Sequence, residues 1–147
     1  MKICIACSAG GHLTEVQQLR AAYENHDRFF LTFRRIDSAY LARTEKVHFI
    51  TDPKRNPLAL LAAAVASFIV FMRERPKVVL TTGAGVAVPV CAIAKLFGRK
   101  VIYVESFCRV VQPSITGRLL YPVADLFIVQ WREMLRRFPK AAYGTLF

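Results

Sequence analysis

Short apolar runs recur along the chain and are separated by segments with helical spacing. The runs predict strands at residues 2–7, 28–33, 46–50, 78–81, 100–104 and 126–130. Between the first two strands, apolar residues recur in steps of three and four, which is typical of one buried helix face. These residues are Leu13, Val16, Leu19 and Tyr23. Alternating strands and helices predict an α/β fold, in which right-handed crossovers build a mostly parallel sheet with helices on both faces.

Two longer apolar segments predict further helices. The segment 86–97 is apolar nearly all round and ends at Gly98, a residue that often terminates helices. The segment 58–72 carries no charge, and as a helix it is about 22 Å long, too short for a hydrocarbon core of about 30 Å.

Cations bracket the segment 58–72, which therefore has the pattern of a helix that lies on an anionic membrane surface. The residues expected at that surface are Lys54, Arg55, Phe68, Phe71, Arg73 and Arg75. The alternative is a helix buried against the sheet, because its alanines and Ser67 suit close packing.

The composition indicates one domain with an unusual charge. A chain of 147 residues is long enough for one core, so we expect a single domain over residues 1–147. The 21 lysines and arginines against 10 acids give a formal charge of +11, which favours anionic lipid, nucleic acid or phosphorylated substrates as partners. The cations are scattered and form no recognised nucleic-acid motif, so nucleic-acid binding is only an alternative and no such partner is expected.

The four cysteines predict free thiols. Cys4 and Cys7 have C-x-x-C spacing but lie in a predicted strand, where a separation of three residues places side chains on opposite faces. No second pair stands near Cys91 or Cys108 to complete a zinc site. We therefore expect buried thiols, no metal, and a reducing cytoplasm.

Two glycine-rich loops follow predicted strands and precede predicted helices. The first is Ser8-Ala9-Gly10-Gly11-His12, and the second is Thr82-Gly83-Ala84-Gly85. Because the carboxyl ends of parallel strands meet at one edge of a sheet, the two loops predict one crevice for phosphate, sugar or nucleotide groups.

The dinucleotide fingerprint is absent from both loops. The first lacks the pattern G-x-G-x-x-G, and in the second Val88 stands where the third glycine belongs. Arg34 and Arg35 occupy the end of the second strand, where an acid would hold a ribose. An NADP-binding oxidoreductase is therefore the alternative that remains, although no cofactor is predicted.

Four motifs in order resemble the bacterial Alg14-like (PssD-like) family of split UDP-sugar glycosyltransferases. They are SAGGHL, TTGAGVAVP, YVESFCRV and GRLLYPVADLFIVQW, and the resemblance covers nearly the whole chain. It implies a Rossmann-like domain equivalent to the N-terminal, acceptor-side half of a MurG-type GT-B glycosyltransferase. A separate chain would supply the donor-binding half, and this subunit is expected to be inactive alone.

The resemblance also implies a function. The expected role is a subunit that binds a lipid-diphosphate-linked acceptor while the complex adds a sugar in exopolysaccharide or capsule biosynthesis. The expected location is the cytoplasmic face of the inner membrane, with peripheral attachment.

Two residues are candidate bases. His12 stands at a helix start, where the positive helix end favours neutral imidazole, which accepts a proton from an attacking hydroxyl. Glu105 is the second candidate, placed beside the acceptor by the family resemblance. Its alternative is structural: accepting backbone N–H groups or pairing with Arg109. The expected substrate-binding residues are Ser8, Gly10, Gly11, Thr82, Gly83, Gly85 and Arg109.

The remaining expectations concern the last third of the chain. Ser114 is expected to cap a helix over residues 115–121. In the resembling family the C-terminal end helps to hold the catalytic subunit, so residues 131–147 are the expected partner-binding segment. Aromatic and apolar anchors favoured at interfaces stand there: Trp131, Phe138, Tyr143, Leu146 and Phe147.

Overall fold

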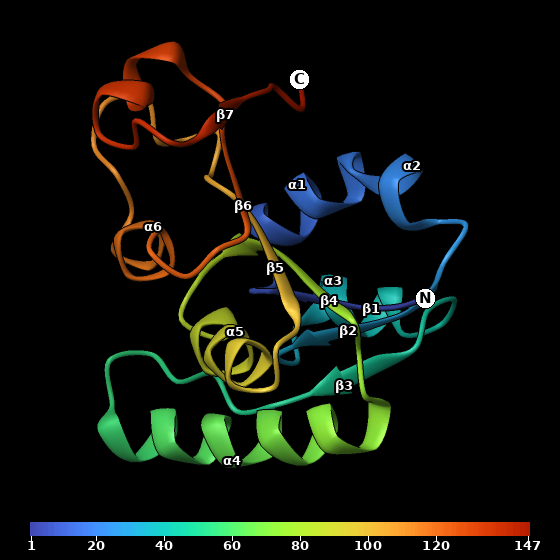
Figure 1. Ribbon diagram of the computed structural model, residues 1–147. Helices are drawn as coiled ribbons and strands as arrows, with labels where there is room; N and C mark the ends of the chain where they lie inside the picture. The colour runs from blue at the N-terminus through green and yellow to red at the C-terminus, as the bar shows by residue number, and fades with distance from the viewer.

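A computed structural model describes all 147 residues and shows one seven-stranded sheet (Figure 1). The strands are β1 (Lys2–Cys7), β2 (Asp27–Thr32), β3 (Val47–Phe49), β4 (Val78–Gly83), β5 (Lys100–Val104), β6 (Leu126–Val129) and β7 (Ala142–Tyr143). Their order is β3-β2-β1-β4-β5-β6-β7, and every neighbouring pair is parallel. The predicted parallel sheet is confirmed, and β7 is a strand that the apolar pattern did not predict.

Helices cover both faces of the sheet, as predicted (Figure 1). One face packs against α1 (Gly11–Gln18), α2 (Arg20–Tyr23) and α3 (Ile36–Leu41). The other packs against α4 (Pro57–Glu74), α5 (Ala87–Leu96), α6 (Ile115–Leu120) and the short 3-10 helix η1 (Arg132–Arg136). The apolar residues predicted for the first helix lie on the α1 side of the sheet, where Leu13, Val16 and Tyr23 are buried.

The alternation of side chains along β1 divides the core into two. Ile3, Ile5 and Cys7 face the α1 side, whereas Cys4 and Ala6 face α4 and α5. The two cysteines therefore lie on opposite faces of the sheet, as predicted. All four cysteines are free, but the expectation of burial is wrong for Cys108, which is exposed in the loop after β5.

The helix α4 is longer than the apolar pattern predicted. It begins with an Asn56 cap, whose Oδ1 accepts the Leu58 N–H at 2.9 Å, and it ends at Arg75 with a φ of 49°. Its 18 residues have a mean hydropathy of 1.7, so α4 alone among the helices is long and apolar enough to cross a membrane by length and composition. The residues added to the predicted segment are Pro57, Arg73 and Glu74, so the apolar run is still the 15 residues of the prediction.

The two faces of α4 differ in burial. Ala63, Ser67 and Phe71 recur every four residues and are buried on the side of α4 that faces the domain, where α5 is its main neighbour. Phe71 was expected at a membrane surface, and its 3% exposure shows that expectation to be wrong. The opposite face leaves Leu58, Leu61, Val65, Phe68, Ile69 and Met72 exposed, and Lys54, Arg55, Arg73 and Arg75 are exposed as well.

A buried carboxylate fastens the C-terminal end of α4 to the sheet. Glu74 Oε2 lies 3.0 Å from Lys2 Nζ, and Glu74 Oε1 lies 2.5 Å from Lys46 Nζ and 2.8 Å from His48 Nε2. Burial acts to raise the pKa of the Glu74 carboxyl, but the hydrogen bonds from Lys46, Lys2 and His48 outweigh it and lower the pKa to about 2.

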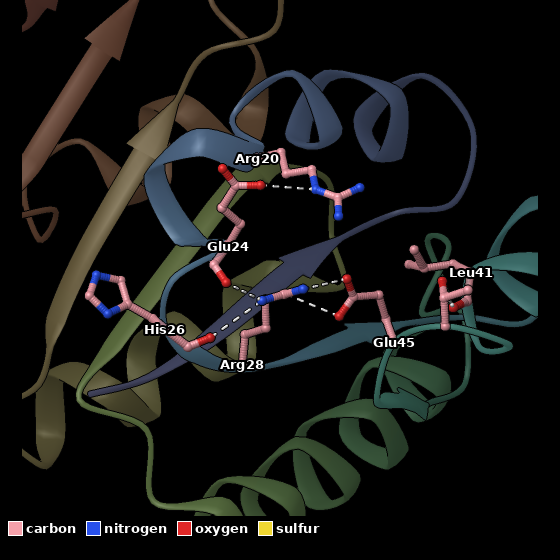
Figure 2. Close-up of polar contacts among 7 residues, drawn as sticks. Arg20, Glu24, His26, Arg28, Leu41 and Glu45 are labelled. Atoms are coloured by element: carbon pink, nitrogen blue, oxygen red, sulfur yellow. Dashed lines mark hydrogen bonds and ion pairs between the residues drawn. The ribbon is translucent and has the colours of Figure 1, made fainter.

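A second ion pair fixes the start of β2 (Figure 2). Two nitrogens of the Arg28 guanidinium donate to the Glu45 carboxylate: Nε to Oε2 at 3.0 Å and Nη2 to Oε1 at 2.7 Å. Its Nη1 donates to the main-chain oxygens of Glu24 and His26, at 2.9 and 3.4 Å. Because both side chains are largely shielded from solvent, this planar two-bond pair holds the α2–β2 turn against the end of α3.

The Glu74 cluster predicts acid sensitivity. The folded pKa lies below the unfolded value of 4.5, so the stabilisation is present above about pH 4.5 and is lost as pH falls to about 2. Glu74→Gln should remove about 3 kcal/mol of this pH-dependent free energy of unfolding, measured by urea denaturation across that range. Glu24→Gln, which removes an exposed pair with Arg20, is the matched control and should leave the pH profile unchanged. Identical profiles for Glu74→Gln and wild type would refute the assignment.

Candidate functional site

A crevice of about 460 Å³ lies at the carboxyl edge of the central strands. Three segments meet there: the β1–α1 loop with the first turn of α1, the loop after β4, and the β5–α6 loop. The lining residues are Ser8, Ala9, Gly11, His12, Glu15, Ala84, Ser106, Cys108, Arg109, Ser114, Ile115 and Thr116. The crevice therefore brings together four residues that the sequence singled out for substrate or catalysis, namely Ser8, Gly11, His12 and Arg109.

The β1–α1 loop is shaped by Gly10. Its φ of 92° belongs to the left-handed region that favours glycine, and α1 begins at the next residue. The Gly10 N–H donates to Asp37 Oδ2 of α3 at 2.5 Å, and Gly10 does not line the crevice. The expectation that this amide binds a diphosphate oxygen is therefore corrected, because Asp37 already occupies it; Gly11 does line the crevice.

His12 is the second residue of α1 and lines the crevice. Its Nδ1 atom is buried and has no hydrogen-bond partner. Its main-chain oxygen accepts a hydrogen bond from Thr82 Oγ1 at 2.8 Å. Thr82 itself is fully buried and does not line the crevice, so it positions the first turn of α1 and does not face a ligand.

The second glycine loop supports the crevice from behind. Gly83 has a φ of 108°, and a Cβ atom there would lie 3.0 Å from the Tyr103 hydroxyl and 3.4 Å from His12 Cε1. Neither Gly83 nor Gly85 lines the crevice, and Ala84 between them does. Thr82 and Gly83 therefore have packing roles, whereas the substrate-binding role expected of Gly85 stays a prediction.

Glu105 is buried, and both of its carboxylate oxygens accept hydrogen bonds from groups of the protein. Oε1 lies 3.2 Å from the Tyr103 hydroxyl and 3.1 Å from the Ser106 N–H, while Oε2 accepts the Ser114 N–H at 3.2 Å and its hydroxyl at 3.0 Å. Burial, and next the charge of Glu105, raise the pKa of Tyr103, so its hydroxyl stays protonated as a donor. Glu105 neither lines the crevice nor pairs with Arg109, and this geometry favours the structural alternative.

Ser114 and Arg109 form the opposite wall with different roles. Ser114 caps α6, as predicted, because its Oγ accepts the Gly117 N–H at 2.8 Å. Arg109 is exposed in the crevice and forms no ion pair with any acid of the chain, so its charge is free to meet an anion.

Sequence reasoning missed Glu15 as a residue of the crevice. It lies one helical turn after His12 and is 6% exposed. Glu15 Oε1 accepts hydrogen bonds from Ser106 Oγ at 2.8 Å and from the Phe107 N–H at 3.0 Å, so it joins α1 to the β5–α6 loop. The spacing of three residues from His12 was the one sequence signal that placed both on the same helix face.

The expected partner-binding residues have unequal exposure. Phe138 is 3% exposed and packs in the core against Tyr121 and Phe127, so its expected role at a partner surface is wrong. Tyr143 and Phe147 are exposed.

The other two residues of that set, Trp131 and Leu146, are partly buried. Trp131 Nε1 donates to the Phe107 main-chain oxygen at 2.7 Å, and the Leu146 N–H donates to Gln130 Oε1 at 3.1 Å. The segment 131–147 is therefore a folded part of the domain that includes η1 and β7.

The arginines of the NADP alternative lie outside the crevice. Arg34 stacks its guanidinium over the Phe49 ring, with 4.3 Å to the centroid, and Arg35 is the residue that precedes α3. Neither lines the crevice.

Comparison with known proteins places the chain in a family. The family described as "Oligosaccharide biosynthesis protein Alg14 like" matches residues 39–147. The chain belongs to the Alg14-like family. Its relatives include the human and mouse proteins named UDP-N-acetylglucosamine transferase subunit ALG14, which are 30% and 43% identical to it; each alignment covers 97% of this chain and 81% of the relative. These relatives are mammalian, so the bacterial PssD-like setting stays a prediction.

Solved structures show the same fold for this Alg14-like chain. MurG of Acinetobacter baumannii matches with a TM-score of 0.72 at 18% identity, over 88% of this chain and 41% of MurG. A UDP-N-acetylglucosamine 2-epimerase from Rickettsia bellii matches with a TM-score of 0.79 at 11% identity, over 99% of this chain and 45% of the epimerase. The chain thus spans less than half the length of these structures, and its fold corresponds to the N-terminal domain of GT-B glycosyltransferases, as expected.

The packing role of the second loop is testable at Gly83. Gly83→Ala should lower the free energy of unfolding by about 1–3 kcal/mol, because the side chain strains a positive φ and presses on the Tyr103 hydroxyl. Gly85→Ala is the matched control in the same loop, since Gly85 has no positive φ and its Cβ would meet only Pro53 at 3.4 Å. Urea denaturation compares the two variants, and equal stabilities would contradict the assigned role.

Proposed function

We propose that this chain is the acceptor-binding subunit of a two-chain UDP-sugar glycosyltransferase. The complex adds a sugar to a lipid-diphosphate-linked acceptor in exopolysaccharide or capsule biosynthesis. The crevice at the carboxyl edge of the sheet carries this proposal, because it combines His12 with an unpaired Arg109 in a domain that has the fold of MurG. The names of the ALG14 relatives support transfer of N-acetylglucosamine.

Several residues of the crevice bind the acceptor, and another accepts a proton. Arg109 and the Gly11 amide at the start of α1 bind the acceptor diphosphate, because a guanidinium and a helix N-terminus both attract phosphate oxygens. Ser8 adds a hydroxyl on the same side of α1. Glu105 acts from behind by holding the β5–α6 loop.

His12 accepts the proton of the reacting hydroxyl. In that step the acceptor oxygen forms a bond to the anomeric carbon of the UDP-sugar, while the bond from that carbon to the UDP oxygen breaks and UDP leaves with the electron pair. The hydroxyl proton passes to the imidazole. The donor nucleotide lies on the partner chain, so this subunit needs no cofactor or metal.

The partner is a chain with the donor-binding half of a GT-B enzyme. This proposal is supported by the word subunit in the names of the ALG14 relatives. The C-terminal segment 131–147 offers Tyr143 and Phe147 as exposed anchors for that partner.

The exposed face of α4 attaches the protein peripherally to the cytoplasmic face of the inner membrane. Apolar side chains cover that face, and exposed cations stand at both ends of the helix. This arrangement suits insertion of apolar groups at the headgroup boundary together with attraction to anionic lipid.

Reconstitution with a donor-half partner tests the catalytic proposal. With UDP-N-acetylglucosamine and a prenyl-diphosphate-linked N-acetylglucosamine acceptor, His12→Ala should lower kcat by about 10²–10⁴, because the proton acceptor is removed. His26→Ala is the matched control, since His26 lies in the turn before β2 and away from the crevice. Full activity of His12→Ala would exclude the base role, and no activity with the wild-type pair would refute the proposed function.

Vesicle sedimentation tests the membrane surface. The double variant Phe68→Ser, Ile69→Ser should bind anionic vesicles about tenfold or more weakly, since it removes two exposed apolar groups from α4. Ile36→Ser on α3 is the control, because Ile36 is 93% exposed on another helix. Binding by the wild type should fall with added salt and with neutral lipid, and binding that ignores both would count against the proposal.

A further inference from the structure

Glu15 is the only acidic residue among those that line the crevice. It lies on α1 one turn after His12, and more than nine-tenths of its surface is buried. The other charged lining residue is Arg109, on the β5–α6 loop. The crevice therefore contains one buried carboxylate and one exposed guanidinium, which recognise different chemical groups.

The two oxygens of Glu15 have different surroundings. Oε1 accepts hydrogen bonds from Ser106 Oγ and the Phe107 N–H, whereas Oε2 is buried and has no hydrogen-bond partner in the protein. A buried carboxylate oxygen without a donor is costly, so such an oxygen normally receives a hydrogen bond from a bound water or from a ligand. His12 Nδ1, three residues earlier on the same helix face, is also buried without a partner.

The chemistry of Oε2 selects the group that it binds. A carboxylate repels a diphosphate, so the lipid-diphosphate part of the acceptor must lie toward Arg109 and not at Glu15. A neutral O–H donor suits a carboxylate oxygen and forms a short, strong hydrogen bond with it. The acceptor carries such donors on its sugar.

We infer that Glu15 Oε2 accepts a hydrogen bond from a hydroxyl of the acceptor sugar. The crevice then recognises the sugar through Glu15, beside His12, and the diphosphate through Arg109. This inference rests on the proposed function and adds to it a residue that distinguishes a sugar-bearing lipid from a bare lipid diphosphate.

Binding of two lipids to the full-length chain, without the partner, tests the inference. The probes are a C15 prenyl diphosphate carrying N-acetylglucosamine and the same prenyl diphosphate without sugar. Glu15→Gln keeps an oxygen for Ser106 and Phe107 but places an NH₂ donor in the position of Oε2. It should raise the Kd of the sugar-bearing lipid about tenfold or more without weakening the bare lipid.

Thr14→Ala is the matched control, because Thr14 is an exposed neighbour of Glu15 on α1 that does not line the crevice. It leaves both oxygens of Glu15 with their contacts, so the preference for the sugar-bearing lipid should persist. Thermal unfolding of both variants separates loss of recognition from loss of fold.

Four results would overturn the inference. They are an unchanged lipid preference in Glu15→Gln, an equal loss for both lipids with a lowered Tm, equal binding of both lipids by the wild type, and loss of the preference in Thr14→Ala. Binding of neither lipid by the wild type would remove the acceptor site itself, and with it the proposed function, which distinguishes that failure from the other four.

Discussion

The shape of the crevice depends on the hydrogen bonds that the buried carboxylate of Glu105 accepts. Four donor contacts, from Tyr103, Ser106 and Ser114, surround its two oxygens. A buried carboxylate costs several kcal/mol unless such donors replace water, so the end of β5 and the start of α6 hold a fixed relation. Gly117 completes this arrangement, because a Cβ atom there would collide with Glu105 Oε2. The wall of the crevice that the β5–α6 loop forms therefore has its shape without a bound ligand.

The same residue links the crevice to the C-terminal segment. The Glu105 main-chain oxygen accepts Gln130 Nε2 at 3.0 Å, and Gln130 Oε1 accepts the Leu146 N–H at 3.1 Å. Trp131 reinforces this path by donating to the Phe107 oxygen. The segment that ends at Phe147 is therefore joined by hydrogen bonds to the β5–α6 loop, which lines the crevice.

The sequence specified the sheet more completely than the site. Six strands were predictable because each has an apolar run that must be buried, whereas β7 is only Ala142–Tyr143 and is defined by its backbone pairing with β6. The sequence placed the first glycine loop correctly at a strand end. It did not predict that the Gly10 N–H donates to Asp37, because Asp37 lies 27 residues away along the chain. The role of Glu105 was likewise undecidable, since only the fold brings Ser114 to it. Phe71 and Phe138 show the same limit: an aromatic residue in an amphipathic segment is assigned to core or surface by its neighbours in space.

The loop between β3 and α4 reaches the loop after β4, which connects the two proposed surfaces. A Cβ atom on Gly85 would lie 3.4 Å from Pro53, so the loop that carries Lys54 and Arg55 packs against the loop after β4. Ala84 of that loop lines the crevice. A helix that rests on the membrane through Phe68 and Ile69 would thus hold its cationic N-terminal end, and the neighbouring crevice, near the headgroup layer. A lipid-linked diphosphate is confined to that layer by its chain, so an acceptor site needs access from that side and not from bulk solvent. This geometry gives a physical reason for combining an apolar helix face, flanking cations and a crevice with a free arginine in one small domain.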